Sequence, residues 1–149
     1  MTEVLFYHLE RQSLEQALPS LLQRCLERGW RAAVEVGGED RLRDLDNRLW
    51  SYDDASFLAH GTAADGHEED QPIYLTTQTD NPNNADVRFF VDGAATDSFE
   101  GYERMVFLFD GADEEATAKA RQAWKEATAA GADATYWRQD EAGKWGKQA

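Results

Sequence analysis

The sequence predicts a three-layer α/β fold, in which a mostly parallel sheet is flanked by helices. Short apolar runs rich in β-branched and aromatic residues alternate along the chain with longer segments of helical periodicity. The chain has 149 residues, of which 42% are hydrophobic, and this size and composition suit one domain with one core. We therefore expect a single domain over residues 1–149, with a polar C-terminal tail from about residue 139.

A strand followed by a helix is expected at the start of the chain. The segment Val-Leu-Phe-Tyr at 4–7 is typical of a buried strand. Ser13 and Gln16 have the spacing of a capping box, and leucines then recur at helical intervals up to Gly29, a natural helix end. Pro19 lies inside this pattern. Either the helix starts properly at Pro19 or the proline bends it, because proline suits a first helical position and disrupts a helix interior.

The next segment predicts a second strand and a second helix. Residues 30–36 have the composition of a strand and are followed by two glycines. The apolar stripe of the helix consists of Leu42, Leu45, Leu49 and Trp50. From 51 to 71 the periodicity fades into Gly, Asp, His and Glu. A connection of this length is usually functional or mobile.

The second half of the chain predicts more strands and one further helix. Apolar runs at 72–76, 87–91 and 105–109 have the length of buried strands. An alanine-rich helix is expected from Asp113 to Ala130, because acidic residues lie near its start, as the helix dipole favours. Residues 134–137 have the composition of a last short strand. Strands that alternate with helices in this way favour a mostly parallel sheet.

The chain is strongly acidic, with a net charge of −14. This charge argues against direct nucleic-acid binding and against binding to anionic membranes. No apolar run approaches the roughly 20 residues of a membrane span, and the N-terminus lacks a secretory pattern, so we expect a cytoplasmic protein. Residues 1–118 carry a net charge of −16, whereas residues 119–149 carry +2. This basic end is either ordinary tail chemistry or a docking site for an acidic partner.

The motifs of nucleotide, metal and nucleophilic sites are absent from the sequence. The glycines at 37 and 38 lack the spacing of a dinucleotide or phosphate loop and are followed by two acids, Glu39 and Asp40. His60 and His67 lie near acidic residues without metal-ligand spacing. Cys25 is the only cysteine and lies on an apolar helix face. We expect no cofactor and no metal; the alternative is a small nucleotide- or metal-responsive enzyme that uses residues 51–71 as a lid.

Two groups of aromatic residues are candidates for binding surfaces. Trp50 and Phe57 are core or interface residues, since tryptophan and phenylalanine serve in both places. Trp124 lies three residues beyond Arg121 and seven beyond Thr117, so the three share one face of the last helix. That face offers a ring for packing and a cation that can pair with carboxylates.

Short motifs with a fixed order and spacing run along nearly the whole chain. They are Phe6-Tyr7-His8-Leu9, Gly29-Trp30-Arg31, Leu45-Asp46, Leu49-Trp50, Ser56-Phe57-Leu58, His60-Gly61, Gln71-Pro72, and Ala120-Arg121 with Trp124. Each motif alone has little specificity. In this order and spacing, the chain resembles the chi subunit family of bacterial DNA polymerase III, an accessory protein of the clamp-loader complex.

The resemblance implies a non-catalytic adaptor with a nucleotide-binding-like α/β fold that has no nucleotide site. Members of this family bind the acidic, Phe-terminated C-terminal tail of single-stranded-DNA-binding protein. The resemblance implies that Arg121 pairs with tail carboxylates and that Trp124 walls the pocket for the terminal Phe, with Lys125 and Tyr136 nearby. Thr117 stands where well-known members carry a tail-binding lysine.

The resemblance also implies a second surface, which maps onto Trp50 and Phe57. In the family this surface binds the psi subunit, and through it the clamp loader. Many bacteria that have chi lack a recognisable psi, and in some lineages chi also binds a helicase-like protein. The expected partners are therefore single-stranded-DNA-binding protein and psi or a replacement. Family properties alone predict a monomer in isolation.

Overall fold

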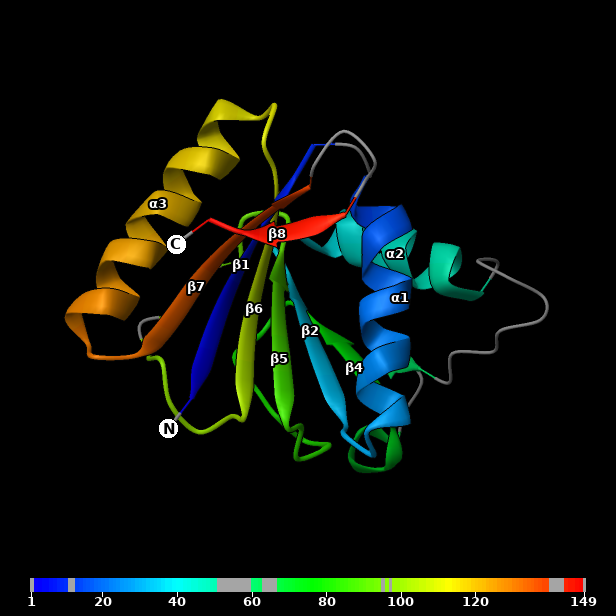
Figure 1. The fold of residues 1–149 in the computed structure, drawn as a ribbon. Coiled ribbons are helices and arrows are strands. Elements are labelled where there is room, and N and C mark those ends of the chain that lie inside the picture. The colour runs from blue at the N-terminus through cyan, green and yellow to red at the C-terminus, as the bar shows by residue number, and fades with distance from the viewer. Residues whose placement is uncertain are drawn as a thin grey trace.

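The computed structural model describes residues 2–10, 13–50, 60–62, 67–94, 96, 98–139 and 144–148. Its helices are α1 (Leu14–Glu27), α2 (Glu39–Trp50), the short 3₁₀ helix η2 (Glu68–Asp70) and α3 (Glu114–Ala129). Its strands are β1 (Glu3–Leu9), β2 (Ala32–Val36), β3 (Gly61–Thr62), β4 (Ile73–Thr76), β5 (Val87–Val91), β6 (Arg104–Asp110), β7 (Asp133–Gln139) and β8 (Trp145–Lys147). Helices α1 and α2 lie on one side of the sheet and α3 on the other (Figure 1). This is the three-layer α/β fold that the sequence predicts.

The strands form one mostly parallel sheet. Its order is β3-β4-β2-β5-β6-β1-β7-β8, and β8 pairs antiparallel with β7 while the other neighbouring strands pair in parallel. Strand β1 therefore lies between β6 and β7, two strands that are distant from it in sequence. This placement brings the N-terminal strand under the last helix.

Helix α1 starts at the capping box and not at the proline. The backbone N–H of Ser13 donates to the side chain of Gln16 at 3.0 Å, and the helix then continues through Pro19. Gly29 ends it with a φ of 78°, a left-handed conformation that glycine adopts without a steric penalty. Of the two alternatives for Pro19, the structure shows the proline inside the helix.

The two faces of the sheet pack into two separate cores. Alternate side chains of a strand point to opposite faces, so Leu5 and Leu9 pack on the α1 and α2 side while Val4 and Phe6 pack on the α3 side. Helix α3 buries only Ala120 and Ala127 fully. These small residues let the helix approach the sheet closely, and the phenylalanine rings of the strands fill the layer between them.

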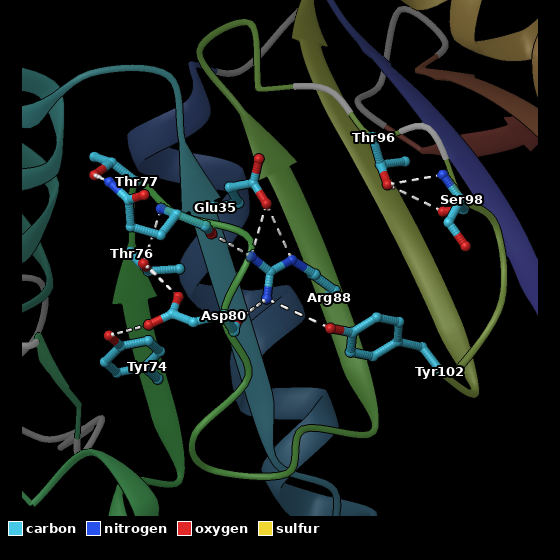
Figure 2. Close-up of polar contacts among 10 residues, drawn as sticks. Glu35, Tyr74, Thr76, Thr77, Asp80, Arg88, Thr96, Ser98 and Tyr102 are labelled. Carbon is cyan, nitrogen blue, oxygen red and sulfur yellow. Dashed lines mark hydrogen bonds and ion pairs between the residues drawn. The ribbon is translucent and has the colours of Figure 1, made fainter.

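A buried ion pair fixes the part of the α3-side face that lies over β2 and β5. The Arg88 guanidinium donates to Glu35 at 2.7 Å, to the carbonyl of Asp80 at 2.6 Å and to the carbonyl of Gln78 at 2.7 Å (Figure 2). Both charged side chains are almost completely buried. The ion pair therefore joins two strands and the loop after β4, and its remaining donors are satisfied by backbone carbonyls.

Some elements differ from the sequence-based expectation. Strand β2 begins at Ala32 and not at residue 30, and β7 extends beyond 134–137 at both ends. The two-residue strand β3 is not expected from sequence, because so short a segment has no periodicity. Within the expected polar tail, β8 forms and places Trp145 edge-on against Tyr7 at 4.8 Å between ring centroids. No helix in the described part of the chain is long and apolar enough to cross a membrane.

Candidate functional site

The sequence of α3 determines where the helix starts and which of its faces packs on the sheet. The side chain of Asp113 caps its start by accepting from the backbone N–H groups of Glu115 at 3.0 Å and Ala116 at 3.2 Å. Alanines then face the sheet, and Trp124 packs at the edge of this contact. One side of α3 runs beside β7, and we call this side the flank of α3. The residues expected to bind a partner lie on it.

Three aromatic rings form the centre of this flank, and we call Phe6, Trp124 and Tyr136 the aromatic edge. Phe6 and Tyr136 are register partners on β1 and β7. The Trp124 ring contacts both of them edge-on, with centroids 5.4 Å from Phe6 and 6.0 Å from Tyr136. Trp124 and Tyr136 are only partly buried. The aromatic edge is thus anchored in the core and open on its outer side.

Cations flank the aromatic edge. Arg121 is exposed one helical turn before Lys125, which is also exposed. Burial raises the pKa of Tyr136, and the nearby guanidinium groups of Arg138 and Arg121 act against this increase. The structure therefore places Arg121, Trp124 and Tyr136 together, with Lys125 next along the helix.

Thr117 contributes no charge to this flank. Its hydroxyl donates to the carbonyl of Asp113 at 2.9 Å, within its own helix. Lys119 does not supply a positive charge in place of Thr117. Its ammonium group lies 3.7 Å from Glu115, and the residue lines a crevice at the carboxyl ends of β1, β5 and β6. The helix position one turn before Arg121 is thus neutral.

Three functional candidates, His8, Glu10 and Arg138, were not identified from the sequence. Nδ1 of His8 lies 2.7 Å from the Tyr136 hydroxyl, and Nε2 of His8 lies 3.4 Å from Glu10. Glu10 also forms an ion pair with Arg138, the register partner of His8. Burial is the main cause that lowers the pKa of His8, and Arg138 and Arg121 lower it further, while Glu10 and Asp110 act against them. Because the net shift is downward from 6.5, the imidazole is mainly neutral at pH 7. The sequence did contain a signal for two of these residues. Phe6, His8 and Glu10 alternate at a spacing of two, which places their side chains on one face of an extended segment.

The second expected surface lies elsewhere. Trp50 is the last residue of α2, which covers the opposite side of the sheet from α3 (Figure 1). Phe57 lies outside the described residues. A partner surface formed by these two residues stays a prediction.

A crevice of about 520 Å³ opens at the carboxyl ends of β1, β5 and β6, where open α/β sheets bind nucleotides. Its acidic lining residues are Glu10, Glu15, Asp92, Asp110, Asp113 and Glu115. Of the two cations among its described lining residues, Arg41 is paired with Glu15 at 2.8 Å and Asp92 at 3.2 Å. This excess of carboxylates is unfavourable for phosphate groups. Among the described residues, no cluster of three or more His, Cys, Asp or Glu side chains has the geometry of a metal site.

Comparison with known proteins places the chain in a family. The family described as DNA polymerase III chi subunit, HolC, matches residues 1–135, so Tyr136 and Arg138 lie just beyond the matched range. A similar protein is the "Probable DNA polymerase III subunit chi" of Rickettsia prowazekii (strain Madrid E), 29% identical over 87 residues. These residues are 58% of this chain and 53% of the relative, so the chain spans about half the length of the curated relative it matches. The resemblance found in the sequence is confirmed, and the chain belongs to the DNA polymerase III chi subunit family.

Proposed function

We propose that this chain is a non-catalytic accessory subunit of the DNA polymerase III clamp-loader complex. In this proposal it binds the acidic, Phe-terminated C-terminal tail of single-stranded-DNA-binding protein during DNA replication. The observation that carries the proposal is the partly exposed aromatic edge beside Arg121. We call the binding surface the tail site; it consists of Thr117, Arg121, Trp124, Lys125 and Tyr136.

The tail site suits such a ligand by charge and by shape. An acidic peptide is repelled by a chain of net charge −14, so it needs a locally positive landing point. Arg121 and Lys125 provide one on the helix. The edge of Trp124 provides apolar surface for a terminal phenyl ring, and aromatic pairs favour such edge-to-face contacts.

The chemistry of the described residues supports a role without catalysis. Burial raises the pKa of the Cys25 thiol to about 11, so Cys25 is a poor nucleophile. The His8 imidazole is held between Tyr136 and Glu10. The alternative is a small nucleotide- or metal-responsive enzyme that uses residues 51–71. Its nucleotide-responsive form has less support, because the carboxylates of the crevice at the strand ends are unfavourable for phosphate groups.

The remaining parts of the proposal concern organisation and partners. Residues 1–149 are proposed to act as one domain in the cytoplasm, as a monomer when alone, without direct contact to nucleic acid or membrane. Trp50 and Phe57 are proposed to bind the psi subunit or its replacement, or a helicase-like protein. The position of α2 across the sheet from α3 supports this division, because two partners on opposite faces do not compete for space (Figure 1).

The test is a titration with a fluorescent peptide that copies the C-terminal end of the source organism's single-stranded-DNA-binding protein. Fluorescence anisotropy at low and moderate salt should show micromolar binding that weakens with salt, because charge pairing contributes. Arg121→Ala and Trp124→Ala should each abolish it. Arg43→Ala is the matched control, since Arg43 is exposed and paired with Asp40 on α2. Salt-independent binding that survives both tail-site substitutions would overturn the site assignment.

A further inference from the structure

A carboxylate of the chain itself already lies at the margin of the tail site. Glu10 follows β1, forms an ion pair with Arg138 and lies 3.4 Å from Nε2 of His8. Its side chain is 26% exposed and that of Arg138 is 48% exposed. The contact is therefore open to solvent, and another carboxylate can reach the same guanidinium.

The strand register explains why Arg138 belongs to this surface. Phe6 pairs with Tyr136, and His8 pairs with Arg138, two residues further along the same two strands. Residues two apart on a strand share a face, so Arg138 lies on the same side of the sheet as Tyr136. It is displaced from Tyr136 toward the carboxyl end of β7.

The charges of Arg138 and Arg121 both act on His8 and Tyr136. The positive charges of both guanidinium groups lower the pKa of His8, after the larger effect of burial, and both oppose the burial-induced rise in the pKa of Tyr136. Two cations, one from β7 and one from α3, thus act on the same hydroxyl–imidazole pair. Because Thr117 is neutral, α3 carries no cation one turn before Arg121.

We propose that Arg138 is a second carboxylate-binding residue of the tail site, and that Glu10 occupies it as an internal competitor until a carboxylate of an acidic peptide displaces it. The exchange replaces one carboxylate–guanidinium pair with another and releases Glu10 from Arg138. Exposed pairs of this kind are weak, so one carboxylate can replace another at Arg138 with little loss of stability. This inference rests on the proposed function for the identity of the peptide.

The experiment compares charge-neutral variants of two glutamates at opposite ends of β1: Glu3 within the strand and Glu10 just after it. Glu10→Gln keeps the size of the side chain and removes its charge, and we expect the peptide described above to bind about two- to fivefold tighter. Glu3→Gln is the matched control, because Glu3 pairs with Arg104 at 3.6 Å at the opposite end of β1. It should leave the affinity nearly unchanged. Arg138→Ala should weaken binding.

A double-mutant cycle distinguishes direct competition from a general charge effect. In the Arg138→Ala background, Glu10→Gln should give no further gain, because the group for which Glu10 competes is absent. Thermal unfolding of every variant checks that the fold is retained.

The outcomes separate this inference from the proposed function. If the unmodified chain binds the peptide and Arg121→Ala abolishes binding, while Glu10→Gln behaves like Glu3→Gln or binds more weakly, the competition is overturned and the proposed function stands. If neither the unmodified chain nor Glu10→Gln binds the peptide, the proposed function itself is overturned. Binding that appears only after Glu10→Gln would support the competition directly.

Discussion

The hydroxyl of Tyr136 lies 2.7 Å from Nδ1 of His8, and this contact ties β7 to β1 beneath the exposed flank of α3. A neutral imidazole that turns Nε2–H toward Glu10 accepts a hydrogen bond from the Tyr136 hydroxyl at Nδ1. The orientation of the Tyr136 ring is thus set by the strand pair before any ligand arrives. A surface that is already ordered loses less conformational entropy when it binds a peptide.

Trp124→Ala should lower both stability and peptide binding. The ring is half-buried against Phe6 and Tyr136, and we expect the free energy of unfolding to fall by about 2 kcal/mol. Trp124→Phe, which keeps an apolar ring, should recover most of this stability. Urea denaturation measures the stability, and the anisotropy titration measures binding.

Arg121→Ala separates the effect on peptide binding from the effect on stability at the same site. The side chain is exposed, so its loss should abolish peptide binding with a change in stability of less than about 0.5 kcal/mol. If Arg121→Ala unfolded the chain as strongly as Trp124→Ala, the guanidinium would have a structural role and the description of the flank would be wrong.

Gly111→Ala should disturb the His8–Tyr136 contact while both of these side chains stay unchanged. A Cβ at position 111 would lie 1.9 Å from Nε2 of His8, so the ring must move. We expect a loss of about 1–3 kcal/mol in stability, as for other overpacked sites. Thermal or urea unfolding measures it. Gly146→Ala is the control, because its Cβ would meet its nearest atom at 3.6 Å, an ordinary contact.

A second substitution identifies the cause of that loss. Shortening the histidine in a Gly111→Ala, His8→Ala double variant should make the glycine substitution less costly than it is alone. Equal losses in the presence and absence of the imidazole would show that the backbone at residue 111, and not the ring, limits the site.

The helix-borne part of the tail site was predictable because its geometry is local. Thr117, Arg121 and Trp124 share a face by helical periodicity alone, and the structure has them on one flank of α3. The capping box at Ser13 was predictable for the same reason, since it involves neighbours in sequence. The three-layer arrangement followed from the alternation of strands and helices.

The Glu10–Arg138 pair beside the tail site was not predictable, because it depends on strand register. Glu10 and Arg138 meet only because β1 inserts between β6 and β7 with Phe6 opposite Tyr136. A shift of one residue would turn Arg138 to the other face. Nothing in a single sequence fixes the pairing of segments that lie more than a hundred residues apart, and the short strand β8 likewise depends on its partner β7.

Glu35→Ala should be strongly destabilising. It leaves the Arg88 guanidinium buried without its carboxylate, and breaking such a pair costs about 3–5 kcal/mol. Replacing both residues with apolar ones should recover much of this loss, because no unpaired charge stays buried. Asp40→Ala, which breaks the exposed pair with Arg43, should cost less than about 1 kcal/mol in the same urea denaturation. Similar losses for Glu35→Ala and Asp40→Ala would contradict the burial of the Arg88 pair.

Stability should depend on pH through His8. Burial, with the charges of Arg138 and Arg121, holds the pKa of His8 below its ordinary value of 6.5 in the folded chain. As the pH falls below about 6.5, the unfolded chain binds a proton that the folded chain does not yet bind, so the free energy of unfolding decreases. The contribution of His8 to the free energy of unfolding is complete above about pH 6.5 and is lost as the pH falls toward the lower, folded-state pKa.

The His8→Gln variant cannot titrate at this position and should lack this pH-dependent component. The measurement is urea denaturation of both proteins between about pH 7.5 and about pH 5, across the range in which histidine titrates. Parallel pH profiles for the two proteins would contradict the prediction, because they would show that the imidazole has the same proton affinity in the folded and the unfolded chain.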